Sequence, residues 1–157
     1  MRRDYFTLDV RGGEWVDTDD DPATPTLVID FEGPASLLQQ QITRDSGSTI
    51  DATSIDVTFR FQTDVDDEDA SGVVSVTDRF TGEYVFELNA SGEAILTFVR
   101  AARECSDRAA TDGARYEIEL QIDGDPKVTF EKKTFLVYTS AGKLLREQSL
   151  IPSGVEL

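Results

Sequence analysis

The fold is decided by residues 55 to 62, which read Ile55-Asp56-Val57-Thr58-Phe59-Arg60-Phe61-Gln62. Apolar side chains occupy every second position, so an extended chain would have one dry face and one wet face. The same alternation recurs over residues 116 to 122, where Tyr116, Ile118, Leu120 and Ile122 are the apolar members, and over residues 27 to 31. These segments are therefore predicted to be half-buried antiparallel strands.

Short turns that contain glycine separate further pairs of apolar runs. They predict three hairpins, formed by residues 73–78 with 83–88, 116–122 with 127–131, and 135–139 with 144–149. The complete set of expected strands is 5–10, 26–32, 54–62, 73–78, 83–89, 115–122, 127–131, 134–139 and 144–150. Residues 135 to 138 are apolar on both faces, which favours a central strand that is covered on both sides.

One amphipathic helix is predicted over residues 91–105, because Ile95, Phe98, Val99, Ala102 and Cys105 recur at spacings of three and four. Ser91 is its expected N-cap. A shorter helix is predicted from Pro34 to about Thr43, with Leu37, Leu38 and Ile42 facing inward. The expected fold is a strand-rich α+β domain, an antiparallel sheet or sandwich with the long helix packed on one face.

The charge balance is the most informative feature of the composition. The 157 residues, enough for one domain, carry 31 acidic and 15 basic side chains, a net charge of −16. Asp outnumbers Glu by 19 to 12 and Arg outnumbers Lys by 11 to 4. Self-repulsion on this scale destabilises a compact state unless salt screens it. The composition therefore predicts a halophilic protein, with an acidic mesophilic protein as the alternative.

The sequence contains no run of about 20 apolar residues that would span a membrane. No apolar export leader follows Met1, so we expect a soluble, cytoplasmic protein.

The sequence offers few side chains for enzyme catalysis. It has no histidine and one cysteine, Cys105, which falls on the apolar side of its helix and is expected to be an inert core residue. Two acidic runs offer hard oxygen ligands for Ca²⁺, but neither has the glycine and glutamate spacing of an EF-hand loop, and solvated loops explain both. They comprise Asp17, Asp19, Asp20 and Asp21, and Asp64, Asp66, Asp67, Glu68 and Asp69. The sequence assigns no catalytic, cofactor-binding or metal-binding residue.

The last third of the chain differs from the rest in charge. Residues 1–99 have a net charge of −15 and residues 100–157 a net charge of −1. This third holds all members of a candidate basic patch for an anionic partner, for which salt bridging on an acidic surface is the alternative reading. The patch comprises Arg100, Arg103, Arg108, Lys127, Lys132 and Lys133. The apolar tail, residues 149–157, is expected to pack on its own sheet, with docking on a partner's sheet edge as the alternative.

Three stretches resemble an uncharacterised haloarchaeal domain family of unknown function. They are Arg2-Arg3-Asp4-Tyr5-Phe6-Thr7-Leu8-Asp9-Val10, Thr81-Gly82-Glu83-Tyr84 and Ser149-Leu150-Ile151-Pro152-Ser153-Gly154-Val155. The resemblance covers the whole chain and carries no functional residue over to it.

We expect a non-enzymatic binding or interaction module that contacts an unknown protein partner through its less acidic last third. The alternative is a small carboxylate-based enzyme or a divalent-cation-binding protein, in which acids from distant segments converge in a pocket. Nucleic-acid binding is not expected, because an acidic protein in high salt gains little from the release of counterions.

Overall fold

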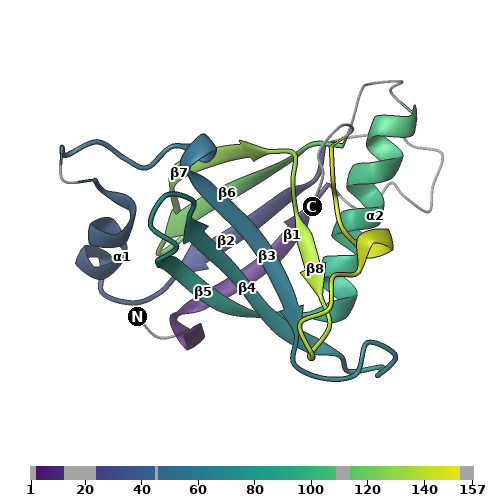
Figure 1. The fold of residues 1–157 in the computed structure, drawn as a ribbon. Helices are drawn as coiled ribbons and strands as arrows, with labels where there is room; N and C mark the ends of the chain where they lie inside the picture. Colours follow the sequence, from purple (N-terminus) through teal and green to yellow (C-terminus); the bar gives the residue numbers. More distant parts are fainter. Residues whose placement is uncertain (1–2, 13–23, 45, 109–113, 153–157) are drawn as a thin grey trace.

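A computed structural model describes residues 3–12, 24–44, 46–108 and 114–152 of the chain. Two four-stranded sheets face each other and enclose one apolar interior (Figure 1). The helices α1 (Ala35–Ile42) and α2 (Gly92–Arg108) lie at opposite ends of this arrangement. The strand-rich α+β fold expected from the sequence is confirmed.

The first sheet has the strand order β1-β2-β6-β7. Its strands are β1 (Phe6–Arg11), β2 (Thr26–Phe31), β6 (Tyr116–Ile122) and β7 (Asp125–Lys132). The pairs β1/β2 and β6/β7 are antiparallel, whereas β2 and β6 run parallel, with Ile29 opposite Leu120. The parallel pair departs from the expectation of antiparallel strands, because the chain builds most of the second sheet before it returns to the first.

The second sheet has the order β5-β4-β3-β8. Its strands are β3 (Ile55–Phe61), β4 (Ser71–Asp78), β5 (Tyr84–Ser91) and β8 (Leu136–Tyr138). The hairpin of β4 and β5 and the hairpin of β6 and β7 are both confirmed. At the centre of the sheet, Gly72 permits close packing: a Cβ there would lie 2.2 Å from the carbonyl oxygen of Arg60.

Strand β8 corrects one expectation. It lies at an edge, parallel to β3, and its side chains Leu136 and Tyr138 are only half-buried. It is therefore not a central strand covered on both faces. The expected partner strand 144–150 is also wrong, because that segment makes only isolated bridges, Tyr138 to Leu144 and Phe135 to Leu150, on either side of the short 3-10 helix η4 (Arg146–Gln148).

Both predicted helices are present, with adjusted ends. Ser91 caps α2, since its Oγ accepts a hydrogen bond from the Ala94 amide at 3.3 Å. Pro34 is the N-cap of α1 rather than part of its first turn. Leu38 and Ile42 are buried as expected, but Leu37 is 39% exposed, so the prediction that it faces inward is wrong.

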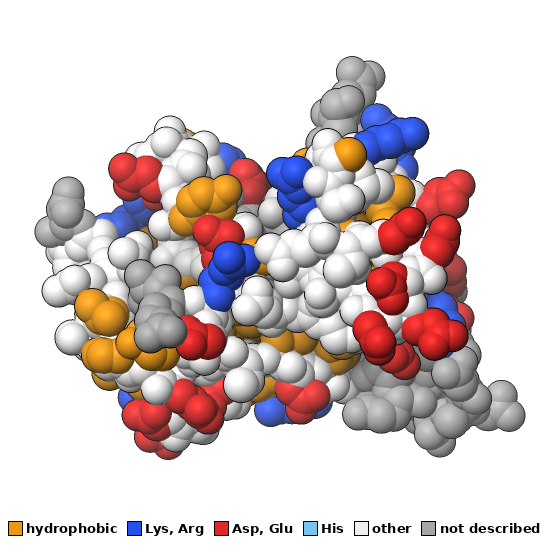
Figure 2. Space-filling model, turned by 90° about the horizontal axis from the view of Figure 1, so that it is seen from below, with side chains coloured by type: hydrophobic (Ala, Val, Ile, Leu, Met, Phe, Trp, Pro, Cys, Tyr) orange, Lys and Arg blue, Asp and Glu red, His pale blue; other side chains and the backbone are white. Residues whose placement is uncertain are grey.

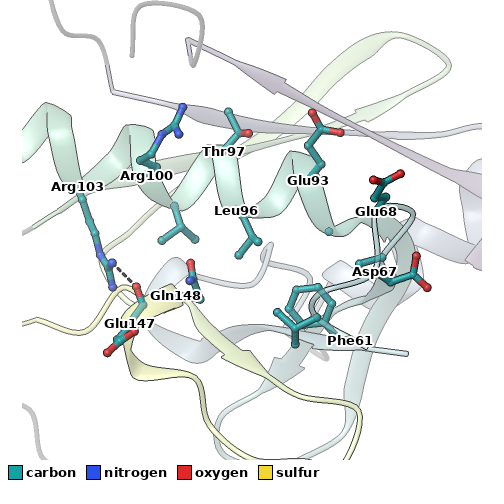
Figure 3. A pocket seen from close by; sticks show the side chains of 14 residues that line it. Phe61, Asp67, Glu68, Glu93, Leu96, Thr97, Arg100, Arg103, Glu147 and Gln148 are labelled. Carbon is teal, nitrogen blue, oxygen red and sulfur yellow. Dashed lines mark hydrogen bonds between the residues drawn. The ribbon is translucent and has the colours of Figure 1, made fainter. Parts of the chain in front are cut away.

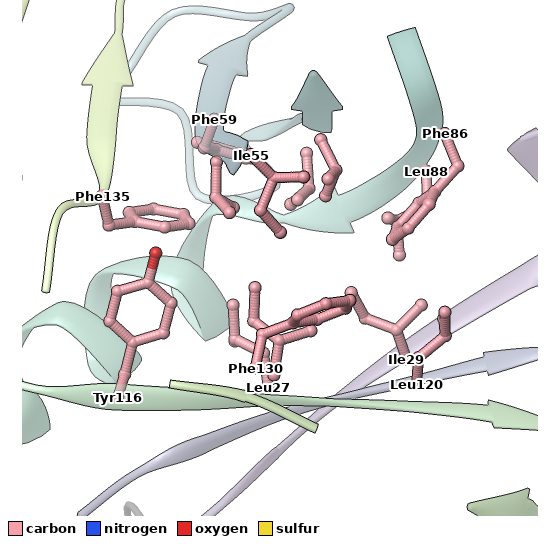
Figure 4. Packing of buried hydrophobic residues seen from close by; sticks show 14 of the residues in the cluster. Leu27, Ile29, Ile55, Phe59, Phe86, Leu88, Tyr116, Leu120, Phe130 and Phe135 are labelled. Atoms are coloured by element: carbon pink, nitrogen blue, oxygen red, sulfur yellow. The ribbon is translucent and has the colours of Figure 1, made fainter. Parts of the chain in front are cut away.

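The interior is one cluster to which both sheets contribute large side chains in two facing layers (Figure 4). Helix α2 adds Phe98, whose ring lies 5.1 Å from that of Tyr116 and 5.3 Å from that of Phe135. Tyr116 comes from the first sheet, and Phe135 immediately precedes β8 of the second. Helix α2 thus packs against the interior where the two sheets meet, and it does not cover the outer side of β8.

Candidate functional site

The second acidic run forms the exposed loop between β3 and β4. Its carboxylates cap amides of the same loop: Asp64 Oδ1 accepts from the Asp66 amide at 3.3 Å, and Asp67 Oδ1 from the Asp69 amide at 3.0 Å. Nowhere in the described residues do three acidic or sulfur ligands converge into a metal-binding group. The first run, Asp17 to Asp21, lies outside the described residues.

The candidate basic patch is divided by the fold. Arg103 donates to the backbone carbonyls of Arg146, Glu147 and Ser149, and so holds the C-terminal segment against α2. Lys132 instead donates to the carbonyls of Ala52 and Ile55. The side chain of Arg108 lies outside the described part of the structure. The sequence neighbours therefore do not act as one patch, although Lys132 and Lys133 line a small pocket with the distant Arg79.

The C-terminal tail packs on its own sheet as far as Leu150, as expected. Leu150 and Phe135 exchange both backbone hydrogen bonds, at 2.7 and 2.9 Å. Ser149 is buried, and its Oγ accepts from the Val137 amide at 2.9 Å. Residues 153–157 lie outside the described residues. The tail thus covers the free side of β8.

Cys105 is half-buried and packs against the fully buried Ala101 on α2, in a small cluster separate from the main core. The expected place on the main apolar stripe is therefore corrected, because the stripe that enters the interior ends at Ala102.

A surface that the sequence did not single out is the outer side of the second sheet, which we call the charge-poor face. Its strand residues point away from the interior, as the strand register shows, although Val73 is only 7% exposed. They are Asp56, Thr58, Arg60, Ser71, Val73, Ser75, Thr77, Tyr84, Glu87, Asn89, Leu136 and Tyr138. A signal was present in the sequence, because the polar positions of residues 71–77 are Ser and Thr, with no acid among them.

The charged side chains of this face each make a polar contact within the molecule, and the one of them held in an ion pair within the described residues is Asp56. Asp56 Oδ1 accepts from Nε and Nη2 of Arg79 at 3.1 and 2.8 Å. Arg60 donates to the carbonyl of Ser140 at 2.7 Å, and Glu87 accepts from Ser75 Oγ at 3.5 Å. The ion pair of Asp56 and Arg79 can therefore meet an uncharged surface without leaving an isolated charge buried.

Exposed aromatic side chains lie at the hairpin end of the face. Tyr84, at the start of β5, is 61% exposed, and Phe80, in the preceding turn, is 76% exposed. In the space-filling view of Figure 2, several hydrophobic side chains gather on the left, where acidic side chains also lie, and a second group of acidic side chains lies on the right. The exposed rings of Phe80 and Tyr84 give the hairpin end of the face apolar contact area.

Two adjoining hollows mark the same region. Their volumes are about 720 and 590 Å³, and Arg3, Gln62, Tyr84 and Glu87 line both of them. The side-chain amides of Gln62 and Asn89 make no hydrogen bond to another described residue, which leaves them available to a ligand.

A separate groove of about 710 Å³ runs along α2 (Figure 3). Asp67 and Glu68 lie at one end and Arg103 at the other, and Leu96 points into it between them. Two arginines, Arg100 and Arg103, line this groove, and Arg103 is already bound to the backbone of the C-terminal segment, so this second side chain serves the fold itself.

None of the described helices is long and apolar enough to cross a membrane. No curated protein and no solved structure matches the chain. A model described as "Family of unknown function (DUF5793)" matches residues 1–157, which confirms the expected membership in a family of unknown function. The chain therefore belongs to the DUF5793 family.

Proposed function

We propose that the protein is a non-enzymatic binding module that docks a protein partner on its charge-poor face. This face is formed mainly by residues 56–89 and not by the last third of the chain, through which the sequence led us to expect the contact. The observation that carries this proposal is the chemistry of the face in a chain with a net charge of −16. Its side chains are mainly hydroxyls, amides and aromatics, and each of its few charges binds another group of the molecule. Protein interfaces show the same depletion of charge at their centre and the same enrichment in tyrosine and arginine.

The charge distribution supports contact at this face in particular. Acidic surfaces repel one another and keep a protein dispersed, so a region with little net charge is where association costs least. We also propose a salt-loaded cytoplasm as the setting. At molar ionic strength the screening length is about 3 Å, and recognition there rests on apolar contact and neutral hydrogen bonds.

The two hollows beside Tyr84 suit this role, because side chains that anchor an interface insert into pockets near its centre. Tyr84 itself offers a large contact area with few rotatable bonds.

The alternative function, a carboxylate-based enzyme or cation-binding protein, receives less support. It requires acids from distant segments to converge, whereas the acids of the Asp64–Asp69 loop bind their own backbone amides.

The test is affinity purification of the tagged protein from its own high-salt lysate, with two variants in parallel. The first variant is Phe80→Asp with Tyr84→Asp, which charges the face at two exposed positions. The matched control is Thr129→Asp, at an exposed position of β7 on the outer side of the first sheet. We expect one stoichiometric partner with the wild type and the control, and its loss with the double variant.

Recovery of the same partner at equal yield from all three proteins would contradict the proposal, as would recovery of the wild type by itself as a monomer. Light scattering on the pure protein identifies the case in which the partner is a second copy. A dimer that the double variant abolishes would then support the same face.

A further inference from the structure

We propose that Arg79, Lys132 and Lys133 form a binding site for the phosphate group of a small molecule. They line a pocket of about 320 Å³, together with Thr53 and Thr134. These residues come from three separate parts of the chain: the short 3-10 helix η3 (Ala52–Ser54), the β4–β5 turn, and the end of β7 with the residues after it. Packing of the two sheets brings them together.

Lys132 is the centre of the site. Its side chain is buried, with 8% of the residue exposed, and Nζ donates to the carbonyls of Ala52 and Ile55 at 2.7 and 2.8 Å. An ammonium group has three donors, so one remains without an acceptor among the described residues. A buried cation with a spare donor at the wall of a pocket is suited to an anion.

The surrounding charges strengthen this preference. Burial lowers the pKa of Lys132, the nearby Arg79 guanidinium lowers it further, and Asp56 offsets part of the effect. Lowering by a neighbouring cation means that like charges face each other here. In a chain with twice as many acids as bases, this local excess of positive charge is unusual.

The nearest acids are already engaged. Arg79 uses Nε and Nη2 on a single oxygen of Asp56, which leaves its remaining Nη1 donors unused within the described part of the chain. Glu131, which also lines the pocket, lies 3.7 Å from Arg115. Lys133 is exposed and makes no hydrogen bond or ion pair to another described residue. Positive charge therefore remains for an incoming anion.

A phosphate group fits these donors better than other anions do. Its oxygens point in four directions and can accept from guanidinium, ammonium and threonine hydroxyl groups at once, and it carries close to two negative charges near neutral pH. A nucleic-acid backbone is disfavoured, because in molar salt a protein gains little affinity from the release of counterions. The ligand is therefore a small phosphate, either free or esterified.

The chain is well suited to a direct test, because it has only four lysines, Lys127, Lys132, Lys133 and Lys143. Their side-chain ε-methylene NMR signals can each be assigned by single substitution. Inorganic phosphate is titrated into the protein at constant molar KCl, so that the ionic strength and the chloride concentration stay fixed. We expect saturable shifts of the Lys132 and Lys133 signals and a rise in the pKa of Lys132, since a nearby anion favours the ammonium form.

The variant Lys133→Gln removes an exposed charge of the site, and Lys127→Gln is its matched control near the opposite end of β7. We expect phosphate to bind about tenfold more weakly to Lys133→Gln, and we expect Lys127→Gln to be unchanged. Adenosine monophosphate, in a second titration, distinguishes the two sources. Tighter binding than inorganic phosphate indicates an esterified ligand, and weaker binding indicates free phosphate.

The proposal is overturned if phosphate shifts no lysine signal in a saturable way. It is also overturned if all four lysines shift together, or if Lys127→Gln and Lys133→Gln weaken binding equally. The site is independent of the protein-docking function, because Lys133→Gln leaves Phe80 and Tyr84 intact. Either proposal can therefore fail while the other stands.

Discussion

The outer sides of the two sheets differ sharply in charge although they enclose one interior. The first sheet carries on its outer side the charged residues Asp9, Arg11, Asp30, Glu117, Glu119 and Glu131. The charge-poor face carries only Asp56, Arg60 and Glu87 in its described strands. Acidic side chains are thus frequent on the outer side of the first sheet and rare on the charge-poor face. Solubility by itself does not require this uneven distribution.

The strand register shows how the contrast arises. On the first sheet Glu117 stands directly opposite Glu131, a like-charge pair of the kind that destabilises neighbouring strands. On the second sheet Thr58 stands opposite Ser75. Salt is therefore expected to stabilise the first sheet more than the second.

The largest expected effect tests whether both faces rest on one cooperative core. Phe98→Ala removes the ring that contacts Tyr116 and Phe135, and we expect it to lower the free energy of unfolding by about 3–5 kcal/mol. Denaturant unfolding in molar KCl, followed by circular dichroism and tyrosine fluorescence, measures it. The exposed Phe80→Ala is the control, with a change within about 0.5 kcal/mol. Two separate transitions in Phe98→Ala would show that the sheets unfold independently, and the comparison of their faces would lose its basis.

A smaller effect is expected where the hydroxyl of Tyr116 connects β6 to the segment between β7 and β8. It donates to the carbonyl of Thr134 at 2.6 Å, so Tyr116→Phe leaves that carbonyl without this partner and costs about 1–3 kcal/mol. Burial raises the pKa of Tyr116 well above 10.0, and Asp56 raises it further.

The raised pKa also gives a pH dependence. Because the folded pKa lies above the unfolded value, this stabilisation is complete below about pH 10 and is lost as the pH rises from there toward the folded pKa. Lys132, with its lowered pKa, makes the free energy of unfolding change with pH in the opposite direction. The difference between wild type and Tyr116→Phe therefore isolates the contribution of the tyrosine. Equal alkaline slopes for the two proteins would contradict the prediction.

The difference in charge between the two sheets can be tested by reversing one acidic charge on each sheet. Glu117→Lys places a cation opposite Glu131, and we expect a gain of about 0.2–1 kcal/mol that grows as KCl is lowered. Glu87→Lys on the charge-poor face faces Ser75 and is expected to give no such gain. Thermal melts across a KCl series measure both variants, and the wild type should melt at lower temperature as salt is removed. A wild-type melting temperature that does not change with salt would contradict the halophilic interpretation.

The alternation of apolar and polar residues predicted the strands well, because it depends only on which face of a strand is buried. Residues 55–61 show the expected burial, with every apolar position buried. The parallel pairs β2/β6 and β3/β8 were not predictable this way, since each joins segments far apart in the chain. The prediction for residues 135–138 was wrong for a related reason. Apolar residues on both faces suggested a central strand, but β8 lies at the edge of its sheet, and the C-terminal tail packs along its free side.

Candidate sites were less predictable because charge is placed by tertiary structure. Lys132 and Arg103 are close enough in sequence to suggest one patch, yet each binds backbone carbonyls of a different segment. The neighbour that Lys132 does acquire, Arg79, is brought near it by the packing of β7 against η3 and the start of β3. The sequence showed which basic side chains the chain contains, but only the fold shows which of them lie close together.

The smallest expected change in stability tests whether the exposed aromatic side chains serve contact or folding. Tyr84→Ser removes a ring that is 61% exposed, and we expect the free energy of unfolding to stay within about 0.5 kcal/mol. If the ring anchors a partner, the same variant weakens partner binding by about 2 kcal/mol or more, roughly thirtyfold.

Tyr84→Phe keeps the apolar area and should retain most of that affinity, which separates ring contact from the hydroxyl. Calorimetry of the purified pair in molar KCl gives both affinities, and the thermal melts give both stabilities. A loss of stability without a loss of affinity would place Tyr84 in the fold. The absence of acids from the charge-poor face would then be explained by the packing of side chains on that sheet. The contrast between the two faces would reflect folding stability instead of partner recognition.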